Sequence, residues 1–136
     1  MMIAETQYRV CYGDTDQMGI VYYGHYPRLM EIGRTETIRS VGFPYKKIEE
    51  LGIIMPVRSV KIDYLKPAYY DDLLTIRIII KELPKVKFTI FSEIYNEKGE
   101  LLNKGETVLA IMDRKSGKPT LAPKEFLDSL KSLDKV

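Results

Sequence analysis

Two aspartates, Asp14 and Asp16, stand in the segment YGDTDQMGIVYYGHY (residues 12–26), just before the residues that predict a long helix. A carboxylate can act as a general base on water or as a nucleophile on a carbonyl carbon. The N–H groups at a helix start are unpaired and carry partial positive charge, so they can polarise that carbonyl. This order of groups indicates a site that transfers an acyl group to water, with Asp16 as the carboxylate and the N–H groups of Tyr23 and Gly24 as the donors.

The same residues have a plainer interpretation, which the spacing alone favours. Aspartates before a helix usually bind local N–H groups as turn or cap residues. His25, the only histidine, falls in the first helical turn, where it is either an acid or base or a half-buried polar residue. Glu31 is either a second site carboxylate or an ordinary surface partner of Arg34. The sequence leaves these alternatives open.

The elements that must position these groups follow from the hydrophobic pattern. Apolar residues at spacings of three and four predict one long helix over residues 24–41. Alternation predicts a half-buried strand over 5–12, and β-branched and aromatic runs predict strands over 54–65, 73–83, 86–95 and 101–112. Short helices are expected over 44–51 and 123–133. Short links favour antiparallel pairing of neighbouring strands, with the long helix packed on one face of the sheet. The predicted fold class is α+β, in a single domain spanning residues 1–136.

Composition narrows the class of partner. The net charge of +2 is too mild for a nucleic-acid-binding surface. No run approaches the roughly 20 apolar residues of a membrane span, and no signal peptide is recognisable, so we expect a cytoplasmic protein. With one cysteine and one histidine, a zinc site would need several carboxylates to complete it, so we expect no metal, and we expect no cofactor. Apolar residues on both faces of the strand at 73–83 indicate a homo-oligomer.

Two longer strings carry a family resemblance. YGDTDQMGIVYYGHYPRLMEIGRTE resembles the signature of the 4-hydroxybenzoyl-CoA thioesterase family, whose D-x-D-x-x-G-[IV]-V-[FYW] core leads into the central helix. KIDYLKPAYYDDLLTIRIII resembles the second and third strands of that family, so the resemblance covers nearly the entire chain. It implies the hotdog fold, a long helix wrapped by a five- or six-stranded antiparallel sheet. It also implies that dimers form a continuous sheet with active sites at the subunit interface, and that the protein is a dimer or a homotetramer.

By this resemblance the protein is an acyl-CoA thioesterase in which Asp16 is the catalytic carboxylate and the Tyr23 N–H polarises the thioester carbonyl. We expect Gly24 and His25 to contribute to substrate binding. Attack by Asp16 on the carbonyl and attack by an activated water both remain open. Some relatives, linked to cell-envelope maintenance, carry histidine where this chain has Tyr23, and His25 lies two positions further on. This departure argues against a mechanism assisted by histidine.

Two other functions are compatible with the sequence. The first is a hotdog module that binds acyl-CoA or an acyl-carrier protein without hydrolysing it. The second, ranked last, is a dehydratase, because the histidine-bearing hydration motif of such enzymes is absent from the sequence. The acyl group is left open. Five apolar residues either line its pocket or belong to the core: Tyr22, Tyr23, Tyr26, Met30 and Met55.

Overall fold

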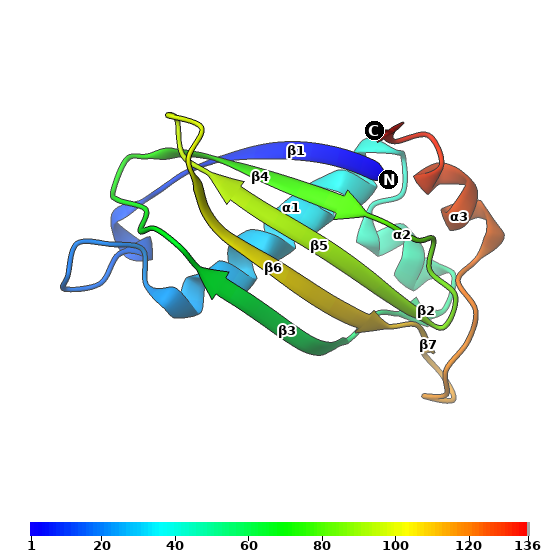
Figure 1. Ribbon diagram of the computed structural model, residues 1–136. Helices are drawn as coiled ribbons and strands as arrows, with labels where there is room; N and C mark the ends of the chain where they lie inside the picture. Colours follow the sequence, from blue (N-terminus) through cyan, green and yellow to red (C-terminus); the bar gives the residue numbers. More distant parts are fainter. Residues whose placement is uncertain (136) are drawn as a thin grey trace.

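A computed structural model describes residues 1–135 and has one long helix lying across a six-stranded antiparallel sheet (Figure 1). The main sheet contains β1 (Met2–Arg9), β3 (Val57–Tyr64), β4 (Leu73–Ile80), β5 (Lys87–Tyr95), β6 (Leu101–Ala110) and β8 (Asp134–Lys135). Strands β2 (Ile53–Ile54) and β7 (Met112–Asp113) form a small separate pair. The helices are α1 (Tyr26–Ser40), α2 (Tyr45–Glu50) and α3 (Lys124–Leu130), and two 3-10 turns are η1 (Tyr12–Asp14) and η2 (Tyr23–His25). The α+β hotdog architecture predicted from the sequence is confirmed.

The strand order in the sheet is β3-β6-β5-β4-β1-β8. The prediction that sequence neighbours pair is confirmed for β4 with β5 and for β5 with β6. It is wrong for β3, which pairs with β6, because the segment 65–72 crosses to the other side of the sheet before β4 begins. Strand β4 pairs instead with β1, which comes before the helix. The strand β3 is consequently an edge of the sheet (Figure 1).

Helix α1 packs on the inner face of the sheet because β4 and α1 both present apolar side chains there. On β4 every second residue is buried, namely Leu74, Ile76, Ile78 and Ile80. Gly33 of α1 lies against this surface so closely that an added Cβ would stand 2.6 Å from Cγ2 of Ile76. A glycine inside a helix costs about 0.5–1 kcal/mol relative to alanine, so its presence here reflects the short distance between helix and sheet.

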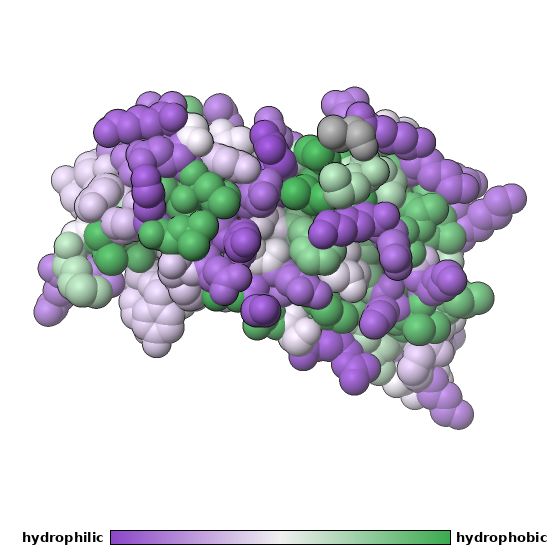
Figure 2. Space-filling model, in the orientation of Figure 1, coloured by the Kyte–Doolittle hydropathy of each residue, from purple (hydrophilic) through white to green (hydrophobic). Residues whose placement is uncertain are grey.

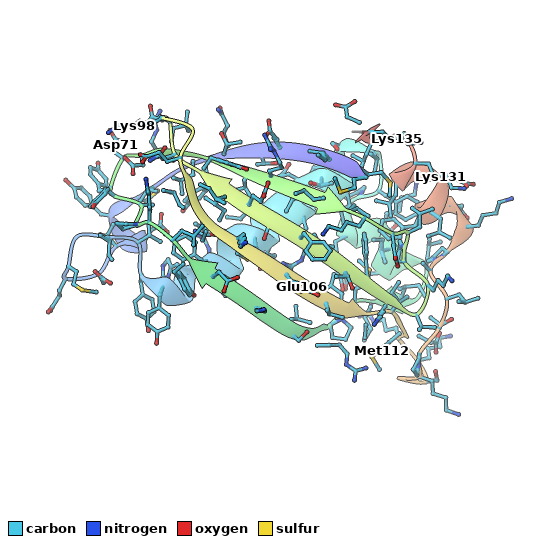
Figure 3. The ribbon with its side chains drawn as sticks, in the orientation of Figure 1. Asp71, Lys98, Glu106, Met112, Lys131 and Lys135 are labelled. Carbon is cyan, nitrogen blue, oxygen red and sulfur yellow. The ribbon has the colours of Figure 1, made fainter. Side chains whose placement is uncertain are left out.

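The outer face of the sheet, which faces the viewer in Figure 2, mixes hydrophobic and hydrophilic side chains. Ile79 of β4 and Phe91 of β5 are half-buried on it, and Lys81 lies over the Phe91 ring at 4.0 Å. Glu106 of β6 lies near the middle of the same face (Figure 3). Both faces of β4 are therefore apolar in part, as the sequence pattern at residues 73–83 indicated.

Element boundaries differ from prediction mainly at the first strand. It runs from Met2 to Arg9, not over 5–12, and Tyr12 is 74% exposed in η1 because the chain turns there toward the long helix. The long helix begins at Tyr26 after the short turn η2, within two residues of the predicted start. In the described part of the chain, no helix is both long and apolar enough to cross a membrane.

Candidate active site

A tight turn fixes Asp16 in front of the helix. Its Oδ1 accepts a hydrogen bond from the Met18 N–H at 2.8 Å, and its backbone N–H donates to the Ile20 carbonyl at 2.9 Å. Gly19 closes the turn with φ +79°, a conformation that glycine adopts without a steric penalty. The side chain is half-buried, and Oδ2 has no hydrogen-bond partner among residues 1–135. One carboxylate oxygen thus remains available for chemistry.

The turn is tied to the segment that follows β3. The Val21 N–H donates to the Ala68 carbonyl at 2.9 Å, and Ile20 forms a β-bridge with Tyr69. These contacts place Asp16 beside the end of β3. In Figure 3, Asp71 marks this end of the sheet, and Met112 marks the opposite end. Two segments about 50 residues apart in the sequence therefore build the site together.

Asp14 has a different role from Asp16. Its side chain is only 6% exposed, and its Oδ2 accepts hydrogen bonds from the Tyr8 hydroxyl at 2.7 Å and the Cys11 N–H at 2.8 Å. The guanidinium of Arg28 lies 3.7 Å from its Oδ1. A carboxylate so engaged holds β1, η1 and α1 together. Of the two aspartates, Asp14 fits the interpretation as a turn residue, and Asp16 carries the free oxygen.

The start of η2 presents unpaired backbone donors. The Tyr22 carbonyl accepts the His25 N–H at 2.9 Å, which fixes the peptide plane that carries the Tyr23 N–H. The Tyr64 hydroxyl donates to the Tyr23 carbonyl at 2.9 Å and so fixes the next peptide, which carries the Gly24 N–H. Neither of these two N–H groups donates a hydrogen bond to any residue that the structure describes. They are oriented donors without an acceptor.

A cavity of about 340 Å³ brings Asp16 and Tyr23 together. Its remaining lining is mostly apolar: Met18, Ile20, Val21, Tyr26, Tyr64, Leu65, Lys66 and Pro67. The ring centroids of Tyr22 and Tyr23 lie 4.8 Å apart, and the Tyr23 phenol and, to a smaller extent, the Asp16 carboxylate raise the pKa of Tyr22. The cavity combines a carboxylate, aromatic walls and one lysine at the N-terminal end of α1.

The other two predicted site residues lie beside this cavity and do not line it. The Nε2 of His25 is 3.2 Å from the Gly13 carbonyl and 3.9 Å from Oδ1 of Asp14. Gly24 packs against the Tyr22 ring, where an added Cβ would stand 2.6 Å from the ring carbon Cε2. Direct contact of Gly24 or His25 with the substrate stays a prediction. In the structure, both residues shape the start of the helix.

Sequence reasoning missed Tyr64 and Lys66 as lining residues. Both lie in the string DYLKPAYY, which ends β3, and the tyrosine, proline and lysine there gave a signal only for a turn. Neither alternative for Glu31 is seen: no ion pair within 4.0 Å joins it to Arg34 in the described residues, and it lines a different cavity from Asp16. Of the five residues that the sequence left as either pocket lining or core, Tyr23 and Tyr26 line this cavity, Met55 lines a second cavity, Met30 is buried core, and Tyr22 is exposed beside the cavity.

Comparison with known proteins gives consistent matches over the chain. A model of the thioesterase-like superfamily matches residues 10–130. YneP of Bacillus subtilis (strain 168) is 36% identical over 128 residues, which cover 94% of this chain and 93% of YneP. The acyl-CoA thioester hydrolase YbgC of Escherichia coli O157:H7 is 31% identical over 123 residues, covering 90% of this chain and 92% of YbgC. The DHNA-CoA thioesterase of Staphylococcus aureus superposes with a TM-score of 0.87 at 31% identity, covering 94% of this chain and 86% of that one.

Proposed function

The chain belongs to the thioesterase-like superfamily, and from this membership we propose that it is an acyl-CoA thioesterase with Asp16 as its catalytic carboxylate. The observation that carries the assignment of residues is the shared cavity. Asp16, whose carboxylate has one free oxygen, and Tyr23, whose oriented amide has no acceptor among the described residues, line the same space. Hydrolysis of a thioester needs these two groups, one to deliver the nucleophile and one to stabilise the oxyanion.

The reaction converts RCO–S–CoA and water to the free acid and CoA. In the general-base route, Asp16 takes a proton from water while the water oxygen bonds to the carbonyl carbon. The carbonyl electron pair moves to oxygen, where the Tyr23 N–H stabilises the negative charge. The C–S bond then breaks, and the CoA thiolate receives the proton that Asp16 holds. Removal of one such oxyanion donor typically costs about 10²–10³ in kcat.

In the nucleophilic route, the free oxygen of Asp16 attacks the carbonyl carbon itself. The C–S bond breaks, CoA leaves as the thiolate, and an acyl-aspartyl anhydride remains. Water then hydrolyses the anhydride and restores the carboxylate. Both routes use the same two groups, and the geometry is compatible with either.

The exposed edge of β3 supports a homodimer. Seven of the eight residues of β3 are exposed, although the inner-face residues Val60 and Tyr64 are apolar and 41% and 50% exposed. A long edge strand with unpaired backbone groups is a template for pairing with a second chain. Pairing of two β3 strands would give one continuous sheet, and the mixed outer face around Ile79 and Phe91 could join two dimers into a tetramer. Because CoA esters are intracellular, we expect the protein in the cytoplasm.

The alternative function is a module that binds acyl-CoA or an acyl-carrier protein without hydrolysis. The exposed aromatic side chains around the cavity, such as Tyr22, Tyr23 and Tyr69, suit ligand binding in either case. Only the thioesterase requires the free oxygen of Asp16.

The test compares the wild-type protein with Asp16→Asn on benzoyl-CoA, short-chain and long-chain acyl-CoAs, following free thiol release. Asp128→Asn is a matched control, since Asp128 of α3 forms only an exposed pair, at 3.6 Å, with Lys131 just after the helix. We expect the wild type and Asp128→Asn to turn over at similar rates, and Asp16→Asn to lose about 10²–10⁴ in kcat. Turnover by Asp16→Asn near the wild-type rate would refute the role of Asp16. Binding without release in all three proteins would favour the alternative.

A further inference from the structure

A second cavity, of about 330 Å³, lies beside α1 at the end of the molecule that Met112 marks in Figure 3. Most of its wall is apolar and comes from the core and from the start of β3: Ile38, Met55, Val57, Phe88, Ile90 and Leu109. Four residues on one side carry polar groups: Glu31, Arg34, Thr35 and Tyr45. The cavity is as large as the one that contains Asp16, and no step of the proposed reaction uses it within one chain.

Arg34 is the unusual member of this wall. Its side chain is half-buried, and burial lowers the pKa of the guanidinium. Among residues 1–135 no hydrogen-bond acceptor is assigned to it, and no carboxylate comes within 4.0 Å. Glu31, on the same helix, is exposed and gives only a longer-range attraction. A guanidinium that is partly shielded from water and has no acceptor on the protein favours a ligand that supplies one, so this cavity is suited to such a ligand.

Among three neighbouring registers, the charges of β3 favour one way of pairing it with a second copy. Ile62 lies opposite Gly105, whose added Cβ would point at Met30 of α1, so Val60, Ile62 and Tyr64 face the helix side. Lys61 and Asp63 face outward. A two-fold axis at Ile62 places Lys61 opposite the partner's Asp63. An axis one residue earlier or later would oppose two lysines or two aspartates, and like charges directly opposite are destabilising.

This pairing brings the two kinds of cavity together. In an antiparallel pair the start of one strand lies beside the end of the other. The Arg34 cavity includes Val57, at the start of β3, and the Asp16 cavity includes Tyr64 and Leu65, at its end. With the axis at Ile62, Tyr64 lies opposite the partner's Val60, about 10 Å at 3.3 Å per residue from the partner's Val57. The β3 residues that line the Asp16 cavity of one subunit then lie near those that line the Arg34 cavity of the other.

We propose that Arg34 of the partner subunit selects the acyl group, by binding a carboxylate at the end of the acyl chain remote from the thioester. The preferred substrates are then CoA esters of dicarboxylic acids, held with their carbonyl at the Tyr23 N–H and their free carboxylate on the partner's Arg34. A guanidinium binds a carboxylate through two parallel hydrogen bonds, which gives selectivity over an alkyl end. This inference rests on the proposed function and on the β3 dimer.

The first experiment measures kcat/KM for ω-carboxyacyl-CoAs of four to ten carbons and for unsubstituted acyl-CoAs of the same lengths. At the best length we expect the wild type to prefer the carboxylated ester by about tenfold or more, as for a hydrogen bond between charged groups. Arg34→Met should reduce that ratio to about one while it still hydrolyses the unsubstituted ester. Arg39→Met is the matched control, because Arg39 is exposed on α1 and pairs with Glu36 at 3.5 Å. An equal ratio in the wild type and Arg34→Met would overturn the proposal.

A second experiment asks from which subunit Arg34 acts. Chains carrying Asp16→Asn and chains carrying Arg34→Met are given different tags, coexpressed, and purified as the mixed dimer. If Arg34 acts across the interface, the subunit that keeps Asp16 faces an intact Arg34, so the mixed dimer has about half the wild-type activity with wild-type selectivity. Activity without selectivity would place Arg34 in the same subunit as Asp16 and overturn the proposal.

Two further measurements test the selectivity of Arg34 separately from the proposed hydrolysis and from the β3 dimer. Binding of both series to Asp16→Asn, measured by calorimetry, gives the selectivity even if no ester is hydrolysed, in which case the proposed function alone fails. Sedimentation of Arg34→Met tests whether Arg34 instead holds the dimer together. A monomeric Arg34→Met protein that has lost activity on every ester would overturn the role in selectivity.

Discussion

Asp14 and Asp16 are two residues apart, and the structure predicts opposite consequences of removing them. In Asp14→Ala, the Tyr8 hydroxyl and the Cys11 N–H both lose the acceptor that they reach at 2.7 and 2.8 Å. Hydrogen bonds to a charged group contribute about 1.5 kcal/mol or more each. Because both donors lie in only partly buried surroundings, water recovers some of the loss. We expect Asp14→Ala to reduce the free energy of unfolding by about 2 kcal/mol.

For a domain of this size, about 2 kcal/mol corresponds to a fall in Tm of roughly 6–8 °C. Asp16→Ala is the matched comparison, since its carboxylate accepts only the Met18 N–H in an exposed turn, and its loss should cost under about 1 kcal/mol. Urea and thermal denaturation of both variants at one protein concentration measure the difference, because dimerisation makes Tm depend on concentration. Equal stability of the two variants would refute the structural role of Asp14. Thiol release should show the reverse order, with Asp16→Ala inactive and folded Asp14→Ala partly active.

Two further substitutions test the positions of α1 and of the helix start. Tyr64→Phe removes the hydroxyl that donates to the Tyr23 carbonyl at 2.9 Å. We expect kcat to fall by about threefold to tenfold, while the free energy of unfolding changes by less than about 1 kcal/mol. An unchanged kcat would show that the peptide is held in place without this hydroxyl. Gly33→Ala places a Cβ 2.6 Å from Cγ2 of Ile76. The overpacking should outweigh the gain in helix propensity, so we expect urea denaturation to show a free energy of unfolding lower by about 1–2 kcal/mol. A variant more stable than the wild type would contradict the close packing.

The sequence predicted the elements well where one periodicity dominates. The helix stripe from Tyr26 to Ile38 and the alternation in β4 are strong signals, because each element buries one face against the other. The pairing of β3 with β6 was not predictable from local pattern. It depends on a crossover by the segment 65–72, and loop length alone does not tell on which side of a sheet a strand returns. The short strand β8 has only two residues and gave no pattern at all.

The site was predictable in part for a similar reason. Asp16 and the Tyr23 amide are close in sequence, so a motif contains both. Tyr64 reaches the Tyr23 carbonyl from 41 residues away, and only the fold brings these two together. Residue spacing alone did not separate the buried Asp14 from the available Asp16, and only the family resemblance assigned the catalytic role to Asp16. That difference comes from Tyr8 and Cys11, whose positions depend on where β1 ends.

The two edges of the main sheet differ, and this difference limits how the protein can polymerise. On the far side from β3, the edge consists of the two exposed residues of β8, which cover only Met2 and Ile3 of β1, and of the rest of β1, which carries the charged side chains of Glu5 and Arg9. Short, charged edge strands resist further pairing. If β3 is the edge of each chain that pairs with another chain, growth by strand addition stops when two chains have joined. A second adhesive edge would allow head-to-tail addition without end, so a substitution that unpairs β8 from β1 creates a risk of fibre formation.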